Sequence, residues 1–147
     1  MDPFKKLMED HKVFLSMIIE LRNTNDPAWR KITAREMVIE INTHMNVEEN
    51  SLYPYLKAAT EGRYLALRSY QEHHIVSVLL KELENTEMEE DNWLAKLEVF
   101  EGILSKHIEQ EDEEVIPKAK QLLSSDQVKD IENMLKLKQQ QSIRSTQ

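Results

Sequence analysis

The sequence predicts an all-α fold, and three observations lead to this prediction. The chain of 147 residues contains only two glycines and four prolines, which leaves little material for hairpins or long loops. The remainder is rich in Leu, Glu, Lys, Met and Ile, most of which are good helix formers. Apolar residues recur with the 3.6-residue period of an amphipathic helix in four separate segments. We therefore expect an up-down-up-down four-helix bundle with an additional short C-terminal helix.

This length is enough for one buried core, so we expect a single domain over residues 1–147. The four-helix bundle should cover about residues 4–121. A C-terminal helix should follow at about residues 125–138, and a polar tail at 139–147 should be frayed.

The first two predicted helices are separated by a turn at residues 23–27. The first carries an apolar stripe that runs from Phe4 to Ile18 with His11 in its middle. The segment 33–36, Thr-Ala-Arg-Glu, has the form of a capping box and predicts that the second helix opens there. Pro54 lacks an amide donor, so it should kink this second helix.

The third and fourth predicted helices have the same kind of pattern. A break at residues 60–62 precedes the third helix, which places Tyr70, His73 and Leu80 on one face. An acidic stretch separates it from the fourth helix, whose buried side should include Trp93 and His107. After that helix, Ser-Ser-Asp-Gln at 124–127 predicts a fresh N-cap for the C-terminal helix.

Composition excludes several classes of function. The chain has no cysteine, so a disulfide framework, a thiolate metal site and a thiol nucleophile are all excluded. A glycine-rich phosphate-binding loop is excluded as well. The net charge of −8 argues against nucleic acid and anionic membrane surfaces as partners. No apolar run approaches the length of about 18 residues that a membrane span needs. We expect a soluble cytoplasmic protein.

One motif, His-x-x-x-Glu, occurs twice, as His44 with Glu48 and as His107 with Glu111. Each copy is followed by a proline ten residues after its histidine. Residues four apart on a helix lie on one face, about 40° apart, so each motif directs an imidazole and a carboxylate into the same space. One such pair is ordinary, but two at matched positions indicate a site that is built twice.

Two further histidines, His11 and His73, complete the repeat. Both follow an acidic residue, and the offset between the halves is 62 residues for this pair and 63 for the two motifs.

Carboxylates in a bundle core are costly unless they are paired, and divalent or trivalent metal ions would offset this cost. Two ions, each held by two imidazoles and both sharing the two glutamates, would use all four imidazoles and both carboxylates of the repeat. Nitrogen and oxygen ligands suit iron, manganese or zinc. The candidate metal ligands are His11, His44, Glu48, His73, His107 and Glu111.

These motifs carry a resemblance to a known family. DH at 10–11, HMNVEENSLYP at 44–54, EH at 72–73 and HIEQEDEEVIP at 107–117 resemble the bacterial form of the hemerythrin family, the HHE cation-binding domain. The resemblance covers roughly residues 7 to 120. It implies a four-helix bundle with a non-haem di-iron centre and a bridging oxo or hydroxo group. The six candidate ligands would hold it, with the two glutamates bridging.

The sequence leaves three choices open at this site. His73 is preferred to the adjacent His74 because only His73 keeps the apolar register of the first half. Asp112 is the rival of Glu111. Tyr70, one turn before His73, points toward the site and could ligate or donate a hydrogen bond there, although a role in the core is favoured.

Oxygen carriers of this family have a second imidazole on the third helix, four residues after the first. Here that position is Ser77. Ferritin-like di-iron bundles use Glu-x-x-His instead, and no glutamate lies three residues before any histidine of this chain. The hemerythrin-like pattern is therefore the better match, with one imidazole fewer than the carriers.

The resemblance implies a di-iron protein that binds or senses O2 or a related small oxidant, such as peroxide or NO. A di-iron enzyme that consumes peroxide or oxidises Fe(II) is the main alternative. Repair of iron–sulfur clusters ranks lower, because that branch commonly carries a cysteine-bearing segment. A bundle that binds a partner and uses metal only for stability is a further alternative. The expected partner is a small diatomic or peroxide ligand, and the protein is expected to be a monomer or a homodimer.

Overall fold

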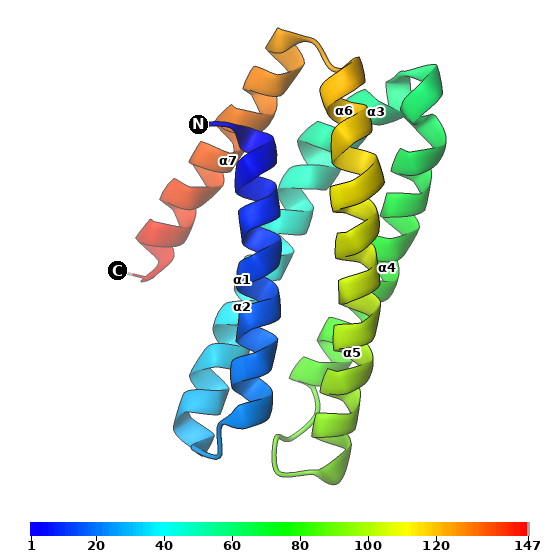
Figure 1. Ribbon diagram of the computed structural model, residues 1–147. Coiled ribbons are helices and arrows are strands. Elements are labelled where there is room, and N and C mark those ends of the chain that lie inside the picture. Colours follow the sequence, from blue (N-terminus) through cyan, green and yellow to red (C-terminus); the bar gives the residue numbers. More distant parts are fainter. Residues whose placement is uncertain (147) are drawn as a thin grey trace.

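Four long helices form the bundle that the sequence predicts, and they run in alternating directions along a common axis (Figure 1). The computed structural model describes residues 1–146, with side chains as far as residue 141, and these residues form no strand. The long helices are α1 (Pro3–Asn23), α2 (Pro27–Val47), α4 (Arg63–Glu84) and α5 (Asp91–Gln110). The shorter elements are the π-helices η1 (Glu48–Leu52) and η3 (Glu111–Val115), the 3-10 turn η2 (Thr60–Gly62), α3 (Tyr53–Ala58) and α6 (Ile116–Leu122). The C-terminal helix α7 (Ser125–Thr146) is as long as α4, so the expectation of a short helix there was wrong.

Aspartate caps followed by proline begin the first two helices. The side chain of Asp2 accepts a hydrogen bond from the amide of Phe4 at 3.0 Å, and Asp26 accepts one from Ala28 at 3.0 Å. Proline is favoured immediately after such a cap because it has no amide hydrogen to leave unpaired. The prediction that α2 opens at the capping box of residues 33–36 was therefore wrong. The helix begins almost two turns earlier, and Thr33 is buried within it.

The predicted N-cap of the C-terminal helix is confirmed. Ser124 and Gln127 exchange hydrogen bonds between side chain and backbone, at 2.9 and 3.2 Å, as a capping box requires. The predicted end near residue 138 was wrong, because α7 continues to Thr146. Residues 139–146 contain neither glycine nor proline, so nothing in the sequence stops the helix there. The last residue of the expected tail, 147, lies outside the described residues.

The core consists of two apolar clusters, one toward each end of the bundle. One contains Phe14, Trp93 and Phe100, and the other contains Phe4, Tyr53 and the α7 residues that anchor that helix. Along α1, α2, α4 and α5, the four histidine positions of the repeat fall between these clusters. The histidines of the repeat therefore form a polar layer in the middle of an otherwise apolar interior.

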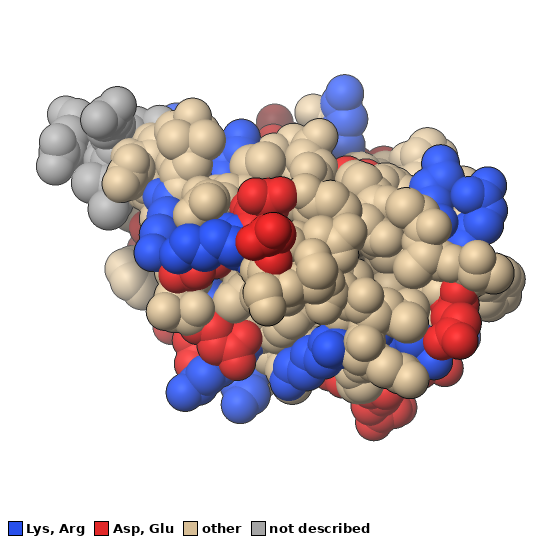
Figure 2. Space-filling model, turned by 90° about the horizontal axis from the view of Figure 1, so that it is seen from above, with Lys and Arg blue, Asp and Glu red and all other residues tan. Residues whose placement is uncertain are grey.

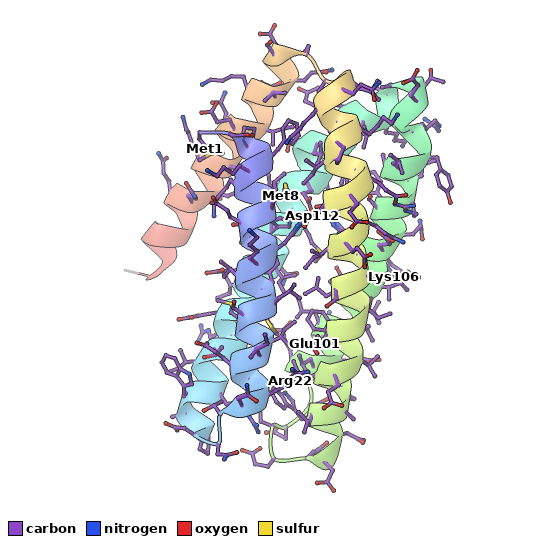
Figure 3. The ribbon with its side chains drawn as sticks, viewed as in Figure 1. Met1, Met8, Arg22, Glu101, Lys106 and Asp112 are labelled. Atoms are coloured by element: carbon purple, nitrogen blue, oxygen red, sulfur yellow. The ribbon has the colours of Figure 1, made fainter. Side chains whose placement is uncertain are left out.

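An ion pair joins two helices at the surface of the bundle, and the end seen in Figure 2 is mixed in charge. The guanidinium of Arg22 on α1 lies 2.6 Å from the carboxylate of Glu101 on α5, which ties the first and fourth helices of the bundle together (Figure 3). Seen from the end where α3 and α6 lie, acidic and basic side chains are interspersed around an uncharged surface (Figure 2). Among the described residues, no helix is both long and apolar enough to cross a membrane.

Candidate metal centre

A π-helical turn lies at the glutamate of each repeat and decides which side chains face the interior. In the first half the amide of Tyr53 bonds to the carbonyl of Glu48, five residues earlier. This turn holds one residue more than an α-helical turn, so Tyr53 takes the place that an i+4 residue would have. His44, Glu48 and Tyr53 therefore share one face. The sequence predicted a kink at Pro54, and the structure has a π-helical turn just before this proline.

The second half repeats the arrangement with one substitution. The amide of Ile116 bonds to the carbonyl of Glu111, again across five residues, and Pro117 follows. His107 and Glu111 thus share a face in the same way as their counterparts. The position that corresponds to Tyr53 is Ile116, so only the first half brings a phenol toward the centre.

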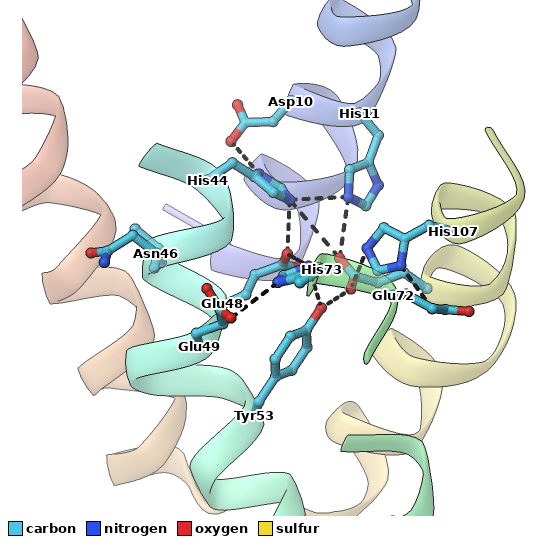
Figure 4. A network of polar contacts seen from close by, with 12 residues as sticks. Asp10, His11, His44, Asn46, Glu48, Glu49, Tyr53, Glu72, His73 and His107 are labelled. Atoms are coloured by element: carbon cyan, nitrogen blue, oxygen red, sulfur yellow. Dashed lines mark hydrogen bonds and ion pairs between the residues drawn. The ribbon is translucent and has the colours of Figure 1, made fainter. Parts of the chain in front are cut away.

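The structure brings together all six residues that the sequence singled out, and each is at least nine-tenths buried. Figure 4 shows how His11, His44, Glu48, His73 and His107 face one another. The Nε2 atoms of His11 and His44 are 3.1 Å apart, and Nε2 of His11 lies 3.2 Å from Oε1 of Glu111. On the other side, Nε2 of His73 lies 3.3 Å from Oε1 of Glu48. Two overlapping groups result, with candidate ligand atoms within 4.8 Å of one another. One consists of His11, His44, Glu48 and Glu111, and the other of Glu48, His73, His107 and Glu111.

Carboxylates hold the outer nitrogens of these imidazoles. Asp10 lies 3.0 Å from Nδ1 of His44, and its counterpart Glu72 lies 2.8 Å from Nδ1 of His107. Such contacts fix the ring orientation and leave Nε2 as the inward donor atom. Asp112 does the same for His11 at 2.8 Å. The fourth imidazole, His73, has the looser contact, with Glu49 at 3.8 Å.

The structure resolves where the rival residues lie. His74 is exposed, whereas His73 is buried in the centre. Asp112 contacts the outer nitrogen of His11, while Glu111 lies on the inner side. Tyr70 is half-buried at the edge of an apolar cluster, and its hydroxyl donates to the backbone carbonyl of Glu49 at 3.2 Å. The structure thus places His73 and Glu111, rather than His74 and Asp112, among the buried groups of the centre.

Sequence reasoning missed Tyr53, whose side chain is fully buried at the centre. Its hydroxyl donates a hydrogen bond to Oε2 of Glu111 and lies 3.0 Å from Nε2 of His73. On a continuous α-helix Tyr53 would point away from His44, so helical spacing alone could not find it. The proline directly after it, in both halves, was the signal that the spacing changes there.

Burial and charge compete at these groups. Burial opposes protonation of His11, but hydrogen bonds to Asp112 and Glu111 outweigh it and raise the pKa of His11 to about 9. Burial likewise opposes protonation of His73, but its contacts with Glu48 and Glu49 raise its pKa to about 9. Burial raises the pKa of Tyr53 well above its usual value, and the charges of Glu111 and Glu48 add to this effect. At both histidines the neighbouring carboxylates therefore outweigh the cost of burial.

The hemerythrin HHE cation-binding domain is the family whose model matches this chain, over residues 2–119. The chain belongs to this family. An uncharacterised hemerythrin-like protein of Schizosaccharomyces pombe is 24% identical over 123 residues, which are 82% of this chain and 61% of the yeast protein. The chain thus spans about three fifths of the length of that curated relative.

A solved structure has the same fold as this HHE domain. It is the crystal structure of a hemerythrin HHE cation-binding domain-containing protein from Mycobacterium kansasii, with a TM-score of 0.81 and 24% sequence identity. The match covers 95% of this chain and 86% of the mycobacterial one. Because this match includes more of the chain than residues 2–119, the fold comparison extends into α7.

Buried atoms without partners show that the centre of this HHE domain fits a metal ion. Both carboxylate oxygens of Glu48 and Oε1 of Glu111 are inaccessible to solvent and make no hydrogen bond of good geometry. The Oε1 atoms of Glu48 and Glu111 have only imidazole nitrogens nearby, at 3.2 to 3.3 Å. Buried oxygens of this kind are rare and costly unless something satisfies them. Four imidazole nitrogens converge on these same oxygens, and a nitrogen and oxygen donor set of this composition binds transition metals.

Proposed function

We propose that this HHE domain is a non-haem di-iron protein that binds or senses O2 or a related small oxidant such as peroxide or NO. The observation that carries the proposal is the pair of overlapping donor groups that share Glu48 and Glu111. Because both glutamates belong to both groups, each of them would help to hold both ions. His11 and His44 would complete one position, and His73 and His107 the other.

Two iron ions in these positions would supply open coordination sites and exchange of electrons with a small oxidant. The protein's own contribution is orientation and exclusion of water. The outer carboxylates hold each imidazole with Nε2 directed inward, and the two apolar clusters seal the layer from both ends. The same donors also suit manganese or zinc, so the identity of the metal must be measured.

Tyr53 favours a second candidate function, the turnover of peroxide or the oxidation of Fe(II). Its phenol lies among the donor atoms of the second position, between His73 and Glu111. A buried hydroxyl there can hold a proton close to the reacting atoms, which turnover requires and simple binding does not. Steady consumption of peroxide or Fe(II) would support this candidate over reversible binding.

The first experiment is metal analysis of protein that has been loaded with iron without oxygen, with absorption spectra before and after exposure to air. About two irons per chain and new near-ultraviolet and visible bands are the expected result. One zinc per chain, or no metal, would contradict the proposal. Azide titration of the loaded protein then tests for an open position, and an unchanged spectrum would argue against binding of small oxidants.

A further inference from the structure

Two of the acidic residues that contact the imidazoles of the centre are preceded by a basic residue on the same helix. Lys6 comes four residues before Asp10 on α1, and Arg68 comes four residues before Glu72 on α4. Residues four apart share one face of a helix, so each pair is spaced to form an ion pair. The two copies are 62 residues apart, as are the histidines that directly follow the acidic residues. The internal repeat therefore includes the basic residues.

In the first half, the basic residue is bound closely to its carboxylate. The ammonium group of Lys6 lies 2.5 Å from Oδ1 of Asp10, and Oδ2 of Asp10 lies 3.0 Å from Nδ1 of His44. Figure 4 shows the contact between Asp10 and His44 on the outer side of the imidazole ring. A cation, a carboxylate and an imidazole thus form one continuous chain that ends at the proposed metal position of His11 and His44. Lys6 is partly buried, so solvent screens its charge only in part.

In the second half, another carboxylate competes for the basic residue. Nη2 of Arg68 lies 2.6 Å from Glu114 on η3, whereas its Nε lies 3.9 Å from Glu72. That Nε atom is buried and makes no hydrogen bond. Glu72 still contacts Nδ1 of His107 at 2.8 Å, so it supports this imidazole without close neutralisation. The position equivalent to Glu114 in the first half is Ser51, 63 residues earlier, which has no charge to compete for the lysine.

We propose that Lys6 and Arg68 are positioning residues that make the two metal positions unequal, and that Glu114 maintains the inequality because it holds Arg68. The inference rests on the di-iron function proposed above. A carboxylate at the outer nitrogen raises the basicity of a ligating imidazole, and a cation that neutralises the carboxylate reduces this effect. The position of His107 should therefore stabilise ferric iron more strongly than the position of His44, and its ion should be the second to be reduced.

The test is a redox titration of the full chain loaded with iron, in which dithionite supplies the electrons and EPR follows the mixed-valence form. The parent should be reduced in two one-electron steps. Lys6→Met removes the cation of the first position, so the step at higher potential should fall by about 30–60 mV, which is a threefold to tenfold change in its equilibrium constant. Lys6→Arg keeps the cation and should restore the potential of the parent.

Glu114→Gln makes the opposite change in the second half. It releases Arg68, whose Nε already lies 3.9 Å from Glu72, so that the guanidinium can neutralise this carboxylate. The step at lower potential should then rise by about 30–60 mV. The gap between the two steps should thus narrow in both variants, although the mean potential falls in one and rises in the other. A general effect of charge would move both steps together and leave the gap unchanged.

Adjacent residues of the same charge supply matched controls. Lys5 and Glu113 are exposed and form no ion pair in the part of the chain that the structure describes. Lys5→Met and Glu113→Gln should leave the gap as it is in the parent. The same gap in Lys6→Met, Glu114→Gln and the controls, or a single two-electron step in the parent, would overturn the inference while leaving the metal centre intact. A parent chain that binds no iron would overturn the proposed function, and the inference with it.

Discussion

Tyr53 and Ile116 occupy the same position in the two halves of the repeat, 63 residues apart, but only Tyr53 brings a polar atom to the centre. Each follows a π-helical turn that starts at a glutamate, and each precedes a proline. Oxygen Oε2 of Glu111 accepts the hydrogen bond of Tyr53, whereas both oxygens of Glu48 lack such a donor. The near-symmetric bundle thus holds an asymmetric centre.

Tyr53→Phe should destabilise the metal-free protein by about 1–3 kcal/mol, because it leaves a buried carboxylate oxygen of Glu111 without its donor. The same change removes an oxygen from the proposed second metal position. We therefore also expect the visible spectrum of the iron-loaded protein to change. Urea unfolding and absorption spectroscopy check the two effects.

Tyr70→Phe is the control for that prediction. Its hydroxyl bonds to a backbone carbonyl at the half-buried edge of the cluster, so its loss should cost only about 0.5–1 kcal/mol and leave the spectrum unchanged. If the two phenylalanine variants behave alike, Tyr53 has no special role at the centre.

His73→Ala and His74→Ala test the register of α4. His73 is buried among the donor groups, so its loss should lower the metal content below two ions per chain and lower the melting temperature of the loaded protein. His74 is exposed, and its replacement should change neither quantity. Mass spectrometry measures the metal content, and a thermal melt measures the melting temperature. Loss of metal in the His74 variant would show that the helix is rotated from the position described here.

The fold and the six central residues could be predicted because both depend on simple periodicities. Residues four apart on an α-helix share a face, so His44 and Glu48, like their counterparts, were found from spacing alone. Tyr53 could not be found in this way, because the π-helical turn changes the angular relation between residues 48 and 53. The start of α2 was missed for a different reason: two N-cap signals compete in that segment, and Asp26 with Pro27 comes first.

The carboxylates that contact the outer nitrogens of the histidines could not be predicted from the sequence either, because each contacts a histidine on a different helix. Asp10 precedes His11 in the chain but supports His44, and Glu72 precedes His73 but supports His107. Acidic residues are too common in this chain for such pairings to stand out. These pairings depend on which helices lie side by side, and the spacing of residues in the sequence does not determine that.

Glu72→Gln should weaken metal binding about 10- to 100-fold, because an amide is a poorer acceptor for the outer nitrogen of His107. The metal content at saturating iron should remain at two, which separates this effect from loss of a ligand. Competition with a chelator of known affinity gives the measurement. Glu82→Gln on the same helix is exposed and should have no effect. A Glu72 variant with the affinity of the parent would mean that the contact does not orient the imidazole.

Replacing each of the two glycines with alanine should change the free energy of unfolding in opposite directions. A Cβ at Gly62 would lie 2.7 Å from the backbone carbonyl oxygen of Leu56, and backbone cannot move aside cheaply. Gly62 has a φ of −99°, so the glycine is needed for space rather than for an unusual conformation. We expect Gly62→Ala to destabilise the protein by about 1–3 kcal/mol.

Gly102 lies in the middle of α5 with nothing within 4 Å of an added Cβ. Gly102→Ala should therefore stabilise the protein by about 0.5–1 kcal/mol, since alanine loses less backbone entropy in a helix. Urea unfolding of both variants, at fixed metal content, measures the pair under identical conditions. A shift of the same sign for both would show that the close approach between residues 56 and 62 relaxes in solution.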